Sequence, residues 1–303
     1  MKLWMGVGTV VLAAALIAAA FAFRPTGEAP AVTTPVTAST AHRSAFPAPP
    51  PGAVVFSRQM GGEALALGVV PQRDSVLLQA SVIGTQGAGV SRLNVSLNGR
   101  RASACGPGCY GTTVTRTPRS VELRVRSTHW RVLLPAVWPP RDANALLSRA
   151  RDAWRSLHSL SFSEHLASDP THATTSTWRV EAPGSIAYQV KGGWAGIVVG
   201  NRRWDRAPTS KRWVASPQSP LTQPVPPWVR VTDAHVLGRS TVGGRPAWRV
   251  SFFDPSTPAW FTVAIDRQTF RTLDSRMTAT AHFMHDAYGS FNTTPAIRAP
   301  IHP

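Results

Sequence analysis

Side chains that could carry chemistry are few and scattered in this sequence. The 303 residues include only 15 acidic side chains. Asp142, Asp205, Asp254 and Asp266 stand where we expect turns, and aspartate at such places usually bonds the local backbone. No nucleophile elbow and no glycine-rich phosphate loop supports a triad of scattered serine, histidine and aspartate residues. We therefore predict no catalytic residues, no cofactor and no enzyme activity.

Two short motifs contain residue types that could form an acid–base or a metal site. Glu164 and His165 are adjacent, so on a strand their side chains point to opposite faces and cannot form a dyad. His282 and His285 could share a metal on a helix, but on a strand they too face opposite sides. The neighbouring threonines favour a strand that runs into a loop. We predict no metal site, and name His282 and His285 as the only candidates for one.

The two cysteines, Cys105 and Cys109, flank a Gly-Pro-Gly loop. In an oxidising compartment such a pair forms a disulfide across the tight loop. A thiolate metal site would need further soft ligands nearby, and none stands in register. We predict the disulfide, with free thiols as the alternative.

The formal net charge is +17, and arginine supplies almost all of the 32 basic residues, since lysine occurs only at Lys2, Lys191 and Lys211. Such a charge favours either an anionic membrane surface or envelope polymer, or nucleic acid. The arginines are scattered along strands and turns, and no nucleic-acid motif is present. We therefore expect no nucleic-acid partner.

The N-terminus begins with a membrane-directed segment. Residues 3–23 form an uncharged apolar run long enough to span a bilayer as a helix. A cleaved signal peptide is the alternative, because Ala20-Phe21-Ala22 resembles a cleavage site. We favour an uncleaved transmembrane anchor over residues 1–24, followed by a Pro/Ala/Thr-rich linker over residues 25–52. The remainder is then extracytoplasmic and held at the cell membrane by a single pass.

Residues 53–135 read as short strands separated by turns. Asn98-Gly99 after an alternating run is a strong hairpin signal. About six strands are expected, at residues 64–70, 75–83, 93–97, 110–114, 121–125 and 130–134. This spacing predicts a small immunoglobulin-like β-sandwich.

Residues 140–292 read as one helix followed by a long antiparallel meander, with residues 293–303 as a tail. Asp142 is expected to cap an amphipathic helix that ends near Leu157. The last three strands are expected around residues 248–253, 260–265 and 270–283, where large apolar residues alternate. The predicted fold class is therefore mainly β, with a transmembrane helix, a β-sandwich and a helix-covered antiparallel sheet.

The Cys-Gly-Pro-Gly-Cys-Tyr hairpin and its flanking strands, residues 55–133, resemble the extracytoplasmic modules of actinobacterial CopD-type copper-transport proteins. That resemblance implies a link to copper. The methionine- and histidine-rich loops of periplasmic copper carriers are absent, however, since Met60 stands alone and His129 has no nearby partner. A copper site in this segment is therefore not expected.

The order of one helix and then a meander marked by tryptophans resembles the LolA/LolB-like fold of lipoprotein carriers, LppX-type lipoproteins and RseB-type regulators. The residues that carry the resemblance are 153–157, 197–205, 244–248 and 266–269. In that family an incomplete barrel wraps around helices and leaves an apolar cavity for acyl chains. Only one convincing helix is predicted here, so the resemblance implies a shallow cavity or one that the protein itself fills.

The apolar strand residues that could line such a cavity are Trp178, Tyr188, Val199, Trp204, Trp213, Trp248, Val250, Phe252, Phe261 and Val263. Alternatively, they fill an ordinary core. The leading hypothesis is a membrane-anchored, extracytoplasmic binding module for a lipid or another apolar envelope ligand with an acyl chain. The alternative is an interaction or sensor module that engages a membrane-protein partner and is linked to copper homeostasis.

Overall fold

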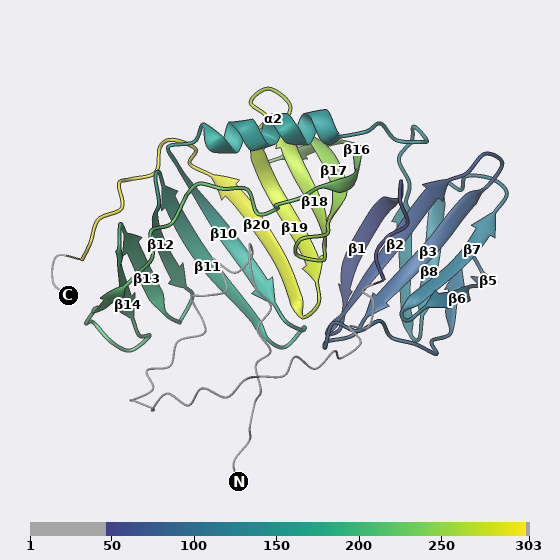
Figure 1. Cartoon of the computed structure of the whole chain (residues 1–303), viewed down its shortest axis with the longest axis horizontal. Coiled ribbons are helices and arrows are strands. Elements are labelled where there is room, and N and C mark those ends of the chain that lie inside the picture. Colours follow the sequence, from purple (N-terminus) through teal and green to yellow (C-terminus); the bar gives the residue numbers. More distant parts are fainter. Residues whose placement is uncertain (1–46, 301–303) are drawn as a thin grey trace, which may run out of the picture.

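The chain folds into three antiparallel β-sheets and one helix, as a computed structural model that describes residues 47–300 shows. The expected mainly β class is confirmed (Figure 1). The predicted transmembrane segment and most of the predicted linker lie outside the described residues. Among the described residues no helix is long and apolar enough to cross a membrane.

The first two sheets face each other as a sandwich (Figure 1). One has the strand order β1-β2-β3-β7-β6 and the other β5-β4-β8-β9. Their strands are β1 (Val54–Met60), β2 (Glu63–Pro71), β3 (Val76–Ile83), β4 (Val95–Leu97), β5 (Arg100–Arg101), β6 (Ser103–Gly106), β7 (Cys109–Val114), β8 (Ser120–Val125) and β9 (Thr128–Leu133). The sequence did not lead us to expect β1, β5 or β6.

Two local predictions in the sandwich are confirmed. Asn98 and Gly99 both take positive φ angles, 49° and 74°, in the turn between β4 and β5, as the mirror-image hairpin turn requires. Cys105 and Cys109 form a disulfide at the hairpin between β6 and β7, with their Cα atoms 5.0 Å apart.

The third sheet has eleven strands in the order β15-β14-β13-β12-β11-β10-β20-β19-β18-β17-β16. Every neighbouring pair is antiparallel, and neighbouring strands are consecutive in the chain except where β20 pairs with β10. The strands are β10 (Ser159–Ala167), β11 (Ala173–Glu181), β12 (Ser185–Val190), β13 (Ala195–Val199), β14 (Arg202–Arg206), β15 (Val214–Pro217), β16 (Thr232–Val242), β17 (Arg245–Asp254), β18 (Ala259–Asp266), β19 (Thr272–Ala279) and β20 (His282–Gly289).

The prediction of one long strand over residues 270–283 is wrong. The chain reverses at Thr280-Ala281, and β19 and β20 pair with each other on either side of this turn. Ala281 adopts the left-handed region, with φ of 49°, at a position where glycine or asparagine would have announced a turn. Because no glycine or asparagine marks this turn, the sequence did not indicate β20 as a separate strand.

The helix α2 (Asn144–Arg155) lies across one face of the large sheet (Figure 1). Its buried residues Leu147, Ala150 and Trp154 join the main core, as the amphipathic pattern predicted. The expected cap by Asp142 is wrong: the N-cap is Ala143, which makes no side-chain capping bond, and Asp142 lies one residue before it and accepts a hydrogen bond from the Asn144 amide at 2.9 Å.

The sandwich packs against the opposite face of the large sheet. Small residues of β1 and β2 meet the large side chains of Phe253, Trp260 and Phe283 in one buried cluster. The hydroxyl of Ser57 also donates to that of Thr278 at 3.1 Å. The large sheet is therefore covered on one face by α2 and on part of the other by the sandwich.

Phe283→Ala tests this packing. Phe283 is 7% exposed and sits between the sandwich and the sheet, so we expect its truncation to lower the free energy of unfolding by about 3 to 5 kcal/mol. Urea denaturation followed by circular dichroism measures the change. Val214→Ala, at a 64% exposed site on β15, should change it by less than about 0.5 kcal/mol. Equal losses of stability in the two variants would show that this cluster does not hold the sandwich and the large sheet together.

Candidate functional site

Aromatic side chains form a continuous row on the helix-covered face of β20, β10, β11 and β12. The rings of Tyr288 and Phe162 lie 5.4 Å apart, those of Phe162 and Trp178 stack at 5.8 Å, and those of Trp178 and Tyr188 stack at 4.8 Å. Trp154 of α2 meets Tyr288 edge-on at 5.3 Å. Strand alternation places the four strand residues on this face because each is the cross-strand neighbour of the next.

Residues 218–228, which we call the strap, cross this aromatic row between β15 and β16 (Figure 1). At its start the Gln218 amide donates to the Asn201 carbonyl at 2.9 Å. At its end Trp228 is buried and packs edge-on to Phe252, with ring centroids 5.4 Å apart. The strap belongs to no strand, so it covers the sheet without sharing its ladder of hydrogen bonds.

The middle of the strap rests on the turn between β11 and β12. The Gln223 amide donates to the Pro183 carbonyl at 2.9 Å. Leu221 packs on the cluster that includes Trp178. A Cβ atom on Gly184 would lie only 2.1 Å from the Leu221 carbonyl oxygen, so this close approach requires glycine.

A small cavity of about 50 Å³ remains between the strap, α2 and the sheet. It is lined by Trp154, Leu160, Phe162, Trp178, Val180, Ile186, Gln223, Val225, Pro226, Pro227, Asp286 and Tyr288. Such a volume suits a few water molecules but not an acyl chain. In this arrangement the protein's own side chains fill most of the space beneath the strap.

One buried carboxyl group, that of Asp286, lines this cavity, and a second, that of Glu164, is its neighbour in the sheet. Glu164 and Asp286 are direct cross-strand neighbours on β10 and β20. Trp178 donates from its indole to the Ser176 hydroxyl at 2.7 Å, and Ser176 donates to Oε1 of Glu164 at 3.1 Å. Tyr288 donates to Oδ2 of Asp286 at 2.7 Å. The second oxygen of each carboxyl, Oε2 and Oδ1, has no hydrogen-bond partner within the part of the chain that the structure describes.

Burial decides the protonation of these groups. Asp286 is 1% exposed, and loss of hydration, reinforced by the charges of Glu164 and Asp274, raises its pKa to about 8. Burial likewise raises the pKa of Glu164, although the bonds from Ser176 and Trp178 oppose it. The pKa of Tyr288 is also raised well above its usual value, mainly by burial. Near neutral pH Asp286 is therefore mostly a neutral acid that can donate a hydrogen bond.

The ten residues predicted to line a cavity do not form one wall. Seven lie on the helix-covered face: Trp178, Tyr188, Trp248, Val250, Phe252, Phe261 and Val263. Of these, only Trp178 lines the strap cavity. Val199 and Trp204 lie on the other face, and Trp213 precedes β15 on that same side.

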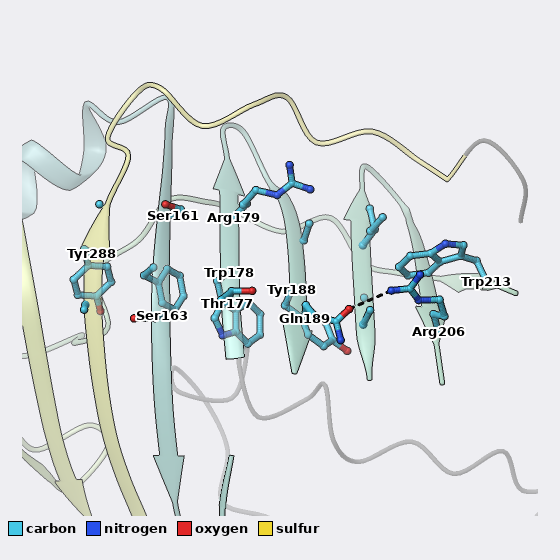
Figure 2. A pocket seen from close by; sticks show the side chains of 17 residues that line it. Ser161, Ser163, Thr177, Trp178, Arg179, Tyr188, Gln189, Arg206, Trp213 and Tyr288 are labelled. Carbon is cyan, nitrogen blue, oxygen red and sulfur yellow. Dashed lines mark hydrogen bonds between the residues drawn. The ribbon is translucent and has the colours of Figure 1, made fainter. Parts of the chain in front are cut away.

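That other face carries a wider hollow, of about 610 Å³, which Figure 2 shows. Its floor is made of small residues such as Ser161, Ser163 and Thr177. At one side Arg206 lies over the ring of Trp213 at 4.9 Å and donates to Gln189 at 3.2 Å. No buried polar group lacking a partner opens into this hollow among the described residues, so we place the candidate site beneath the strap.

The structure also locates the histidines that the sequence singled out. His282 and His285 lie on β20 and face opposite sides, and Glu164 and His165 do the same on β10. Within residues 47–300, no group of three or more histidine, cysteine or acidic side chains could hold a metal ion. Sequence reasoning missed Asp286 and Tyr288 because β20 was not expected, although Met284, Asp286 and Tyr288 keep the period of a strand.

No protein-family model and no curated protein matches this chain. Among solved structures, the chain is similar to the lipoprotein LppX of Mycobacterium tuberculosis, with 13% identity and a TM-score of 0.41 over 51% of this chain and 97% of that one. LprF of Mycobacterium bovis gives 10% identity and a TM-score of 0.40 over 52% and 96%. A LolA superfamily protein of Nitrosomonas europaea gives 7% identity and a TM-score of 0.25 over 52% and 95%. Likeness at this level assigns no function to the chain.

Asp286→Asn tests the buried acid. The raised pKa means that the folded protein holds a proton that the unfolded chain releases between pH 3.8 and about 8, so stability falls as pH rises through this window. Asp286 alone contributes a slope of up to about 1.4 kcal/mol per pH unit. We expect Asp286→Asn to flatten the slope and to raise stability near the upper end of the window, measured by urea denaturation.

Asp74→Asn is the matched control, because Asp74 is exposed in a bend of the sandwich. It should leave the pH profile unchanged. An Asp286→Asn profile parallel to that of the unmodified protein would contradict the assignment of a buried neutral acid.

Proposed function

We propose that the large sheet, α2 and the strap form a binding module for an apolar ligand with a polar end, such as a lipid or another molecule with an acyl chain. The observation that carries the proposal is the buried carboxyl of Asp286, which has an unpartnered oxygen and lines a cavity walled by aromatic rings, with a second such carboxyl, Glu164, directly cross-strand from it. In this proposal the strap is the lid, and the structure is the closed state.

The buried carboxyl pair favours a ligand over an ordinary core. A buried polar atom without a hydrogen bond costs about 1 to 3 kcal/mol, so folded proteins rarely keep one without a role. Oδ1 of Asp286 and Oε2 of Glu164 are such atoms within the described residues. A hydroxyl, ester or amide group of a ligand in the cavity would satisfy Asp286, because a neutral acid donates as well as accepts.

The surrounding surface suits the apolar part of the same ligand. The rings of Phe162, Trp178 and Tyr288 line the cavity together with Val180 and Ile186. Burial of an acyl chain against them gains about 25 cal/mol per Å² of apolar surface. Because the present cavity is far smaller than an acyl chain, entry requires the strap to move.

The strap is built to move more easily than the sheet. Between its two ends it is joined to the rest of the described chain by one backbone hydrogen bond, from Gln223 to Pro183. Its other contacts are side-chain packing through residues such as Leu221 and Trp228. Segments with few hydrogen bonds open at lower free energy than paired strands.

Attachment at the membrane remains part of the proposal. It depends on the apolar run at residues 3–23, which lies outside the described residues. A carrier of lipids in the cell envelope would need both a membrane tether and a cavity that can close. In this proposal the strap closes the cavity.

Gly184→Ala tests the lid. The added methyl group would collide with the Leu221 carbonyl, so we expect the strap to be pushed off the sheet while the β11–β12 turn persists. The expected result is faster hydrogen exchange in residues 219–227 and about tenfold tighter apparent binding of a fluorescent fatty acid, since less energy is then needed to open the cavity. The measurements are exchange mass spectrometry and fluorescence titration in the absence of detergent.

Gly289→Ala serves as the control, because its Cβ would meet nothing within 4 Å. Its fatty-acid affinity should equal that of the unmodified protein. If Gly184→Ala loosens the strap and yet neither protein takes up the fatty acid, and if native mass spectrometry of detergent-free protein finds no bound lipid, the proposed function is wrong.

A further inference from the structure

A second cavity separates the sandwich from the large sheet. This cleft, of about 920 Å³, has β1 and β9 as one wall and the sandwich-facing side of β10 and β16 to β20 as the other. It lies on the face of the sheet opposite to the strap, because its floor residues alternate with those of the helix-covered face. The cleft exists only because the two folded parts pack together.

Basic side chains, two histidines and two arginines, lie together on the floor of the cleft. His165, His285 and Arg276 are direct cross-strand neighbours on β10, β20 and β19. Arg249 projects from β17 on the same face, in the cross-strand row of Ala264 and Asp274, two residues along the strands from the row of Arg276.

Few carboxylates of the described residues lie near the arginines and histidines of the floor. Among the described residues, Asp274 is the only carboxylate within 4.0 Å of them. It is held by Nε2 of His285 at 2.5 Å, whereas Arg276 reaches it only at 4.0 Å. The guanidinium of Arg249 makes no hydrogen bond and no ion pair within residues 47–300, although it is exposed to the cleft.

The facing wall adds further arginine. Arg58 of β1 lies over the ring of Trp130 at 5.8 Å and donates only to the backbone carbonyl of Gln59. Arg131 of β9 also lines the cleft and bonds to the neutral hydroxyl of Ser120. Four guanidinium groups therefore border one cleft, and within the described chain the only carboxylate near them is Asp274, at 4.0 Å from Arg276.

We propose that the cleft between the sandwich and the large sheet binds a phosphate-bearing ligand. A guanidinium presents a planar fork of donors that matches phosphate oxygens in pairs, and charge-assisted bonds of this kind are about twice as strong as neutral ones. The hydroxyl of Thr262, cross-strand from Arg276 on the floor, offers a further donor. The phosphate could belong to a soluble molecule or to the headgroup of an anionic phospholipid.

Arg249→Gln combined with Arg276→Gln tests the proposal in the full chain. The probes are pyrophosphate, for a soluble source, and vesicles of phosphatidylglycerol with phosphatidylcholine vesicles as the neutral reference. We expect the double variant to weaken binding of pyrophosphate, of phosphatidylglycerol vesicles or of both by about tenfold or more. Calorimetry measures the binding of pyrophosphate, and sedimentation measures the binding of vesicles. The probe that binds shows whether the phosphate belongs to a soluble molecule or to a lipid headgroup.

Arg124→Gln combined with Arg155→Gln is the matched control, since it removes the same charge at exposed sites outside the cleft. It should retain full affinity. Thr262→Glu, which places a carboxylate on the floor, should weaken binding as the double variant does, and it covers the case in which the double variant misfolds.

Two outcomes overturn the proposal. One is that neither probe binds to the unmodified protein. The other is that the cleft variants and the control lose affinity equally, which would assign the attraction to the net charge of +17 rather than to the cleft. The test is independent of the strap, because fatty-acid uptake on the other face should be unaltered in the cleft variants.

Discussion

The structure depends on one constraint, the strict alternation of side chains along the eleven strands of the large sheet. Strands in the middle of the sheet must supply two different surfaces at once, one for α2 and the strap and one for the sandwich and the cleft. β20 shows this most clearly, since Asp286 faces the strap while its neighbour His285 faces the cleft. β10 repeats the pattern with Glu164 and His165. The two candidate sites are therefore the two sides of the same pair of strands.

The two ends of the helix-covered face differ in a way that matters for function. Under α2, residues such as Phe252, Phe261 and Val263 are fully buried among apolar neighbours, which is the arrangement of a stable core. Under the strap, the aromatic row meets the buried carboxyl of Asp286, with that of Glu164 beside it in the sheet. A core needs no such groups, and their raised pKa values show how strongly burial disfavours their charged forms.

Arginine has more than one role in this protein. Many guanidinium groups lie over aromatic rings, and Trp248 alone is approached by Arg141, Arg239 and Arg267 at 4.9 to 5.6 Å. Such contacts let a long cationic side chain cover apolar surface and keep its charge hydrated. The arginines of the floor of the cleft lack ring contacts of this kind among the described residues, and Arg249 lacks polar partners as well. The excess of positive charge is therefore shared between covering aromatic surface and the proposed site for an anion.

The sequence by itself determined the local structure: the alternating runs, the Asn98-Gly99 turn, the amphipathic helix and the cysteine loop all follow from contacts within a few residues. It could not indicate the reversal at Ala281, because this alanine adopts a positive φ angle that its residue type does not predict. Only the tertiary structure brought Asp286 of β20 beside Glu164, far earlier in the chain, and placed the strap over the cavity that Asp286 lines. Only the packing of the sandwich on the sheet created the cleft around Arg249 and Arg276. Both sites depend on register and on contacts between distant segments, and spacing along the chain carries no information about either.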